Sequence, residues 1–288
     1  GQPTDRLRRG PFCRLAEGME LNPGDFVFHA DPIHLRPDGN RLVLFAGRPL
    51  AVNPDEAAAL TRHFNQHFVG DGLKLEAPAP GRWYLRVQHP PDLVTTPLHA
   101  VMGRHIGGLL PRGPDARTWA RILNEVQMLF HQASVNQRRE EAGQPAISGI
   151  WPWGGGRLRD FHAHAAYTRV FATDPLTLGL AQAAGNPTAP WSADPAALVA
   201  AMQPPSSLVL LHWQGLWNPV LEADGEAWVE ALQALEIWLA GFLTGMGGDF
   251  TLRLLVREED SFRYRPRHRY RFWRSPLSLG KRLSGVMN

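Results

Sequence analysis

Three residues with different chemistry lie within six positions of one another: Asp31, His34 and Arg36. A carboxylate, an imidazole and a guanidinium at this spacing could bind an anion or transfer a proton. We expect them on a loop between strands at residues 26–29 and 41–45, because loops on a rigid scaffold often contain binding residues. The alternative is that Asp31, which precedes a proline, only caps a turn.

A second candidate is the run of glycines at 154–156, which follows an apolar segment at 147–153. It matches neither the P-loop pattern nor G-x-G-x-x-G. The backbone freedom of glycine favours a tight turn beside Trp151 and Trp153, and a turn that faces a ligand is the alternative. The predicted ligand-binding set therefore comprises Asp31, His34, Arg36, Trp151, Trp153, Gly154, Gly155 and Gly156.

A third candidate is the alternating group Asp160, His162 and His164. On a strand these side chains would share one face, and two imidazoles with a carboxylate can bind a metal ion. The alternative is a set of surface or hydrogen-bonded histidines, because no further ligand is evident. Cys13 is the only cysteine, which excludes an intrachain disulfide and a zinc site built from cysteines. No G-x-S-x-G nucleophile motif is present.

Basic residues are concentrated at the C-terminal end. Residues 261–288 contain eight basic and no acidic residues, whereas residues 1–260 contain 22 basic and 27 acidic ones. On a strand, five arginines would share one face: Arg263, Arg265, Arg267, Arg269 and Arg271. Such a ribbon could bind a polyanion. The favoured interpretation is an edge strand whose aromatic face is buried and whose arginines are solvated or paired with acidic residues.

The elements that would position these residues follow from periodicity and capping signals. Apolar residues at four-residue spacing after Asn53-Pro54 predict a helix near 54–68, and a second helix is expected after 113–115. Strands are expected at 83–87, 208–212 and 250–256, and an amphipathic helix at 226–243. Strands that alternate with helices in the C-terminal half predict an α/β sheet with right-handed crossovers.

Composition narrows the class of protein. The 288 residues are 44% apolar and 20% charged, which is typical of one large or two modest globular domains. No apolar run approaches the roughly 18 residues of a membrane span, and residues 1–9 show no signal-peptide pattern. With a single cysteine, a reducing cytoplasmic location without membrane association is the expectation.

Several segments together resemble a known family. The sequences SVNQRR at 134–139 and ISGIWPWGGG at 147–156 are similar to a stretch of the archaeal-type cofactor-independent phosphoglycerate mutases. The sequence ADPIHLR at 30–36 and the sequence WPWGGG at 151–156 resemble a group of bacterial regulatory proteins, the RpfE proteins. The similarity extends, with gaps, from about residue 24 to about residue 272.

The resemblance implies an α/β fold with an alkaline-phosphatase or phosphoglycerate-mutase-like core sheet flanked by helices. The core would comprise residues 1–45 and 146–288, with an inserted α+β subdomain at 46–145. The enzymes use two metal ions and a serine nucleophile. Their N-terminal metal and nucleophile segment would precede residue 24, where 23 residues are too few for it. Their Asp-x-x-x-His motif aligns with Trp217 and Leu221, and their Asp-His pair has no counterpart after 250–256.

From these differences we expect a regulatory or ligand-binding protein of the RpfE type, without a cofactor and without mutase activity. It would bind a small anionic molecule or a protein partner. One alternative is a metal-dependent phosphatase or phosphomutase that uses Asp160, His162 and His164. A second alternative is polyanion or nucleic-acid binding through the C-terminal arginines.

Overall fold

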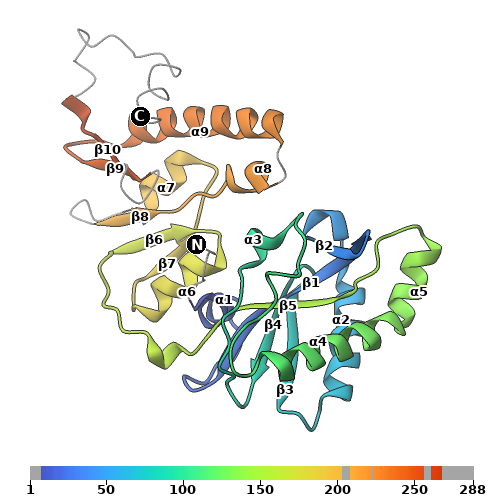
Figure 1. Cartoon of the computed structure of the whole chain (residues 1–288). Coiled ribbons are helices and arrows are strands. Elements are labelled where there is room, and N and C mark those ends of the chain that lie inside the picture. Colours follow the sequence, from blue (N-terminus) through green and yellow to red (C-terminus); the bar gives the residue numbers. More distant parts are fainter. Residues whose placement is uncertain (1–7, 203–207, 222–223, 256–260, 268–288) are drawn as a thin grey trace. The chain divides into compact units, whose positions relative to one another are not determined.

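The computed structural model describes residues 8–202, 208–221, 224–255 and 261–267. The chain divides into two compact units (Figure 1). The first comprises Gly1–Trp191 and Pro204–Trp228, and the second comprises Ser192–Gln203 and Val229–Asn288. These bounds differ from the predicted core and insert, because strands from both predicted parts lie side by side in one sheet of the first unit.

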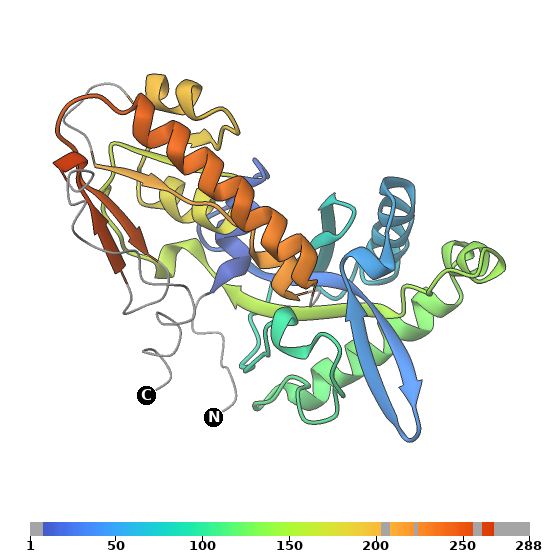
Figure 2. The ribbon, with the colours of Figure 1, turned by 90° about the horizontal axis from the view of Figure 1, so that it is seen from above.

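That sheet contains five antiparallel strands: β1 (Phe26–Asp38), β2 (Arg41–Ala46), β3 (Leu73–Ala79), β4 (Arg82–Val87) and β5 (Gly149–Gly156). β1 lies at its centre and pairs with β2, β4 and β5. β1 continues to Asp38, so the predicted loop after residue 30 is wrong, and the turn to β2 consists of Gly39 and Asn40. Gly39 has a φ of 60°, as a two-residue hairpin turn requires. The β1–β2 hairpin appears as two long arrows in Figure 2.

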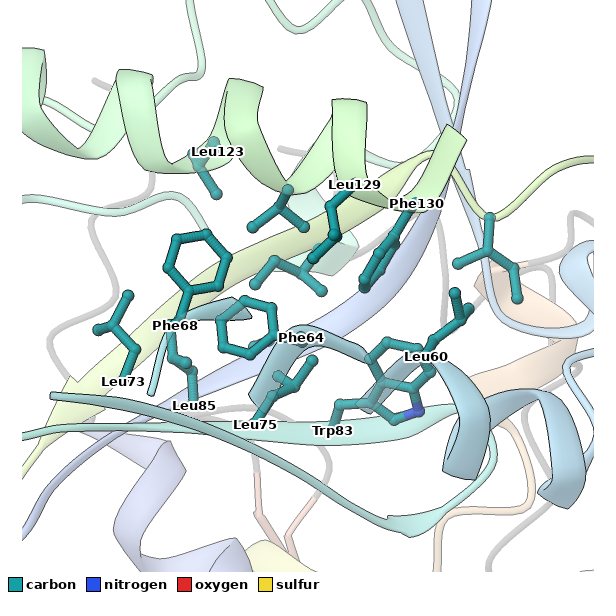
Figure 3. Close-up of a cluster of buried hydrophobic side chains, with 14 of the residues drawn as sticks. Leu60, Phe64, Phe68, Leu73, Leu75, Trp83, Leu85, Leu123, Leu129 and Phe130 are labelled. Atoms are coloured by element: carbon teal, nitrogen blue, oxygen red, sulfur yellow. The ribbon is translucent and has the colours of Figure 1, made fainter. Parts of the chain in front are cut away.

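One face of this sheet carries the largest apolar cluster, which Figure 3 shows in close-up. α2 (Pro54–His67) and α4 (Ala116–His131) cover this face. The predicted start of α2 is confirmed, because Asn53 and Glu56 form a capping box and Pro54 occupies the first turn. Phe64 is fully buried, and its ring centroid lies 4.5 Å from that of Phe68.

The SVNQRR segment forms α5 (Ser134–Glu141), and two of its polar side chains bond buried backbone groups. The buried amide of Asn136 donates to the carbonyls of Phe130 and Ile147 and accepts from the Ile147 amide. The buried guanidinium of Arg139 bonds the carbonyls of Pro145 and Leu50. Arg139 also pairs with Glu56. These bonds fix the connection between α4 and β5.

The other face of the sheet packs against α1 (Arg9–Ala16), which also packs against α6 (Pro175–Ala183). A glycine lies at each of these two contacts, Gly10 in α1 and Gly179 in α6, where a side chain would not fit. A Cβ on Gly10 would lie 2.5 Å from the Val27 carbonyl oxygen, and a Cβ on Gly179 would lie 1.8 Å from the Phe12 carbonyl oxygen. The backbones therefore approach more closely than any larger residue allows. Cys13 is buried here, and burial raises its pKa to about 12.

A three-stranded parallel sheet completes the first unit: β6 (Arg169–Ala172), β7 (Thr188–Pro190) and β8 (Val209–Leu211), in the order β7-β6-β8. α6 connects β6 to β7, so the predicted alternation of parallel strands and helices is confirmed here. Short elements surround the two sheets: η1 (Arg48–Leu50), α3 (Leu98–Val101), η2 (Leu158–Asp160) and α8 (Trp217–Leu221).

The second unit contains α7 (Pro195–Ala201), most of α9 (Gly225–Gly245), β9 (Leu252–Leu255) and β10 (Ser261–Tyr264). α9 and β9 confirm the helix and the strand expected in this region. The Trp238 indole donates to the Ser192 carbonyl, and its ring stacks on Phe242 at 5.1 Å. Within the residues given above, no helix is long and apolar enough to span a bilayer.

Candidate functional site

Asp31 lies in the middle of β1 and is only 6% exposed. Its Oδ2 accepts a hydrogen bond of 2.8 Å from the Trp153 indole, and its Oδ1 accepts one of 3.3 Å from the Trp83 amide. Burial raises the pKa of Asp31 to about 6, although both hydrogen bonds act in the opposite direction. Asp31 is therefore a core residue that binds β1 to β5 and β4.

His29 completes this arrangement from two positions earlier on β1. Its ring stacks on Trp153 with centroids 4.4 Å apart, and it lies 5.0 Å from the Tyr84 ring. Burial, aided by Arg9 and Arg82, lowers the pKa of His29 to about 3. The imidazole is therefore neutral at physiological pH. We call Asp31, Trp153 and His29 the Trp153 network.

The three glycines after Trp153 belong to β5, so the predicted turn is wrong. The pairing of β5 with β1 shifts register between Val27 and His29, and Gly154 has a φ of 62° at this bulge. A Cβ on Gly155 would lie 2.3 Å from the Phe28 ring, and a Cβ on Gly156 would meet the Arg8 side chain. Neighbouring side chains thus occupy the space beside these glycines.

His34 and Arg36 alternate to the opposite side of β1 from Asp31, so the structure does not bring the three together. His34 Nδ1 lies 2.8 Å from the Ala146 carbonyl oxygen, and the Arg36 guanidinium lies 4.6 Å from the Phe45 ring centre. Trp151 is buried and donates its indole N–H to the Thr96 carbonyl. Ligand binding by this set stays a prediction.

The metal-site hypothesis for Asp160, His162 and His164 requires a strand at 160–164, and none forms there. Asp160 ends η2 and pairs with Arg8, while His162 and His164 are exposed in the irregular segment that follows. In the parts of the chain that the structure describes, no three His, Cys, Asp or Glu side chains are grouped as a metal site would require.

The structure instead brings together two residues that the sequence analysis did not select, Asp174 and His212. Asp174 follows β6, and His212 follows β8, so both lie at the carboxyl edge of the parallel sheet. Asp174 Oδ2 lies 2.6 Å from His212 Nδ1. The Thr177 hydroxyl lies 3.0 Å from the same nitrogen. We call Asp174, Thr177 and His212 the edge cluster.

α6 holds the carboxylate of this cluster in place. Asp174 is the N-cap of α6, and its Oδ1 accepts from the amides of Leu176 and Thr177. Burial alone would raise the pKa of Asp174, but the hydrogen bonds from His212 and Thr177 lower it below its usual value. Asp174 is therefore ionised at neutral pH, although it is only 8% exposed.

His212 is oriented by this carboxylate. Its amide donates to the Phe171 carbonyl and continues the pairing of β8 with β6. Nδ1 faces Asp174 and Thr177, which leaves Nε2 to interact with a ligand, and the side chain is 35% exposed. A doubly protonated ring would donate from Nε2 to an anion, and a neutral ring would accept a proton there. Both are established uses of an imidazole held by a carboxylate.

Two tryptophans follow His212 in the chain. The ring of Trp213 lies where a Cβ on residue 215 would be, only 2.0 Å away, so Gly215 is needed for it to fold back. Trp217 begins α8, is 48% exposed, and its ring lies 5.9 Å from that of His99.

A sequence signal for the edge cluster exists. Asp174 precedes Pro175, which is the pattern of an N-cap and first helical residue, and His212 ends an apolar run. A strand at 169–172 would have placed both at the ends of neighbouring parallel strands. That strand has only four residues and was not expected.

Comparisons with a family model and with curated proteins point to the same group of proteins. A family model described as 2,3-bisphosphoglycerate-independent phosphoglycerate mutase matches residues 8–136. A protein of that name from Methanothrix thermoacetophila is 40% identical over 65 residues, which cover 23% of this chain and 17% of the relative. One from Pyrobaculum neutrophilum is 24% identical over 271 residues, which cover 84% of this chain and 65% of the relative.

Among solved structures, that of the PH0037 protein from Pyrococcus horikoshii is similar with a TM-score of 0.54. Its sequence identity is 15%, and the match covers 83% of this chain and 59% of that chain. This match supports the fold alone. The chain thus spans less than two thirds of each of these proteins. Together the matches support a distant, archaeal-type phosphoglycerate-mutase-like relationship.

Proposed function

We propose that this distant relative of the cofactor-independent phosphoglycerate mutases is a regulatory, ligand-binding protein. It binds a small phosphorylated acid at the edge cluster and does not convert it. The observation that carries this proposal is the position of the Asp174–His212 pair beyond the carboxyl ends of β6 and β8. Open α/β sheets bind their ligands beyond the carboxyl ends of their strands.

The chemistry of the pair suits an anionic ligand. Asp174 is ionised at neutral pH and its Oδ2 lies 2.6 Å from Nδ1 of His212, so the carboxylate orients the ring and leaves an Nε2 proton, where one is present, to face an anion. Nε2–H would donate a hydrogen bond to a phosphate oxygen, and a charge-assisted bond of this kind contributes roughly 1.5–3 kcal/mol. We choose a phosphorylated acid as the ligand because the relatives are named phosphoglycerate mutases. We choose His212 Nε2 as the contacting atom because Nδ1 faces Asp174 and Thr177.

Binding without conversion is supported by the residue types around the cluster. Phosphoryl transfer needs a nucleophile and cationic groups or metal ions to neutralise the developing charge. At the aligned metal positions this chain has Trp217 and Leu221, which have no ligating atoms. The segment from His212 to Trp217 supplies aromatic rings instead, which would line the site and exclude water.

Isothermal titration calorimetry with 3-phosphoglycerate tests the binding claim, with glycerate as the ligand that lacks phosphate. The informative variant is His212→Asn, because the asparagine amide can replace Nδ1 opposite Asp174 but has no group at Nε2. We expect the Kd to weaken roughly 10- to 100-fold, which corresponds to one charge-assisted hydrogen bond. His162→Asn removes an exposed histidine elsewhere and should leave the Kd unchanged.

Two results would overturn the proposal. If 3-phosphoglycerate gives no more heat than glycerate with the unmodified chain, the edge cluster does not bind this ligand class. If ³¹P NMR shows the chain converting 3-phosphoglycerate to 2-phosphoglycerate, with or without added Mn²⁺, the protein is an enzyme. Conversion that is lost in an Asp160→Asn variant would favour the metal-dependent alternative.

A further inference from the structure

The β9–β10 hairpin of the second unit places two arginines directly opposite each other. Its register pairs Leu255 with Ser261 and Arg253 with Arg263. Directly opposed residues of an antiparallel ladder have Cβ atoms roughly 5 Å apart, so the two guanidinium groups are neighbours on one face. Both side chains are exposed.

This arrangement is unfavourable for the hairpin alone. Like charges directly opposite each other destabilise a ladder, and a two-stranded sheet is only marginally stable. Among the ion pairs that the described parts of the chain form, none includes Arg253 or Arg263. An anion that bridges the two guanidinium groups would remove this repulsion.

The two faces of the hairpin differ in character. Leu252 lies opposite Tyr264 and Leu254 opposite Phe262, which gives one apolar face, with Tyr264 6.1 Å from the ring of Phe250. The arginine pair lies on the other face. The strand ends at Tyr264, so the long alternating ribbon of arginines is not formed in the described residues. Arg265 is half-buried with contacts of its own, and Arg269 and Arg271 lie outside the described residues.

We infer that the Arg253–Arg263 pair binds the phosphodiester backbone of a nucleic acid, independently of base sequence. Guanidinium groups match phosphate geometry with two parallel hydrogen bonds. A phosphate recurs at every nucleotide, so a bound backbone offers the pair a succession of equivalent phosphates, whatever the base sequence. This site is separate from the edge cluster and independent of the proposed function.

One competing partner for the arginines lies in the sequence itself. Residues 256–260, which connect the two strands, include Glu258, Glu259 and Asp260 and lie outside the described residues. If these carboxylates neutralise the pair, its removal will not affect nucleic-acid binding. The experiment therefore compares the loss of this pair with an equal loss of charge elsewhere.

Fluorescence anisotropy with a labelled 12-nucleotide oligothymidine, across a range of salt concentrations, tests the inference on the full chain. The variant is Arg253→Gln with Arg263→Gln. The control is Arg117→Gln with Arg121→Gln, an exposed pair on α4 with the same change in charge. At low salt we expect the hairpin variant to lose roughly tenfold in affinity and the control less than twofold. The salt slope should fall by about 1.4 for two single-strand phosphate contacts.

Three outcomes would overturn the inference. The unmodified chain binds no oligonucleotide, both variants lose affinity equally, or the hairpin variant binds as tightly as the unmodified chain. Binding to phosphatidylserine vesicles with no binding to the oligonucleotide also contradicts it and indicates a lipid surface. The circular dichroism spectrum and the urea midpoint of the hairpin variant should match those of the unmodified chain, which shows that the variant is folded whether or not 3-phosphoglycerate binds.

Discussion

The indole nitrogen of Trp153 donates a hydrogen bond of 2.8 Å to Oδ2 of Asp31, a residue 122 positions earlier in the chain. The same indole stacks on His29, two residues before Asp31 on β1. One side chain of the WPWGGG segment thus contacts a buried acid and a buried base. Trp153 therefore holds the buried side chains of Asp31 and His29 in place within the sheet.

Replacing Trp153 with phenylalanine should destabilise the protein by about 1–3 kcal/mol. The ring remains, but the Asp31 carboxylate loses its side-chain donor inside the sheet. Urea unfolding followed by circular dichroism measures the change. Trp217→Phe is the matched control at a 48% exposed site, and its effect should stay below about 0.5 kcal/mol. Equal effects of the two substitutions would show that the hydrogen bond to Asp31 contributes nothing.

Asp31→Asn should make stability more dependent on pH between pH 4 and 6. The pKa of Asp31 is raised to about 6 in the folded state from 3.8, so its ionisation lowers stability as the pH rises through this range. The pKa of His29 is lowered to about 3 from 6.5, so its contribution is lost as the pH falls below 6.5. The two effects oppose each other. Without Asp31, stability should rise with pH by up to about 1.4 kcal/mol per unit.

His29→Gln should give the opposite dependence. With the imidazole removed, the ionisation of Asp31 acts alone, and stability should fall as the pH rises from 4 to 6. Urea midpoints at half-unit pH intervals measure both variants. A His29→Gln profile that still rises with pH would show that His29 is not the group that opposes Asp31.

Gly179→Ala should destabilise the first unit, because the added Cβ would lie 1.8 Å from the Phe12 carbonyl oxygen. α1 and α6 must move apart, and overpacking of this kind costs about 1–3 kcal/mol or more. Thermal unfolding gives the shift. Gly107→Ala, where a Cβ has no neighbour within 4 Å, is the control and should change the midpoint little. An unaltered midpoint for Gly179→Ala would mean that the helices pack less closely than described.

The sequence predicted those parts of the fold that depend on local signals. The start of α2 at Asn53-Pro54, the apolar stripe of α2 and the long helix α9 all follow from neighbouring residues, and all are confirmed. β1 was misjudged because Pro32 and the charges around it resemble a loop. Its pairing with β5, which lies far along the chain and places Ile150 opposite Pro32, keeps it extended. Local propensity does not contain that information.

The edge cluster was missed for a related reason, because its local signals say nothing of which strands pair. Asp174 and His212 are 38 positions apart, and only the parallel pairing of two very short strands, β6 and β8, brings them within 2.6 Å. The residues that did attract attention, Asp31 and Trp153, are unusual because a buried polar network needs specific partners. In a single sequence, a polar residue that is buried with specific hydrogen-bond partners cannot be distinguished from a residue that binds a ligand.

The central claim is that His212 Nε2 contacts a phosphorylated acid, and the most direct measurement is long-range ¹H–¹⁵N NMR of histidine-labelled protein during a titration with 3-phosphoglycerate. The spectrum of His212→Asn assigns the His212 signals. We predict that the Nε2 resonance of His212 shifts in a saturable manner, while its Nδ1 resonance, held by Asp174, and the signals of His162 stay nearly fixed. A saturable shift at other histidines with no change at His212, or no shift at all, would contradict the account.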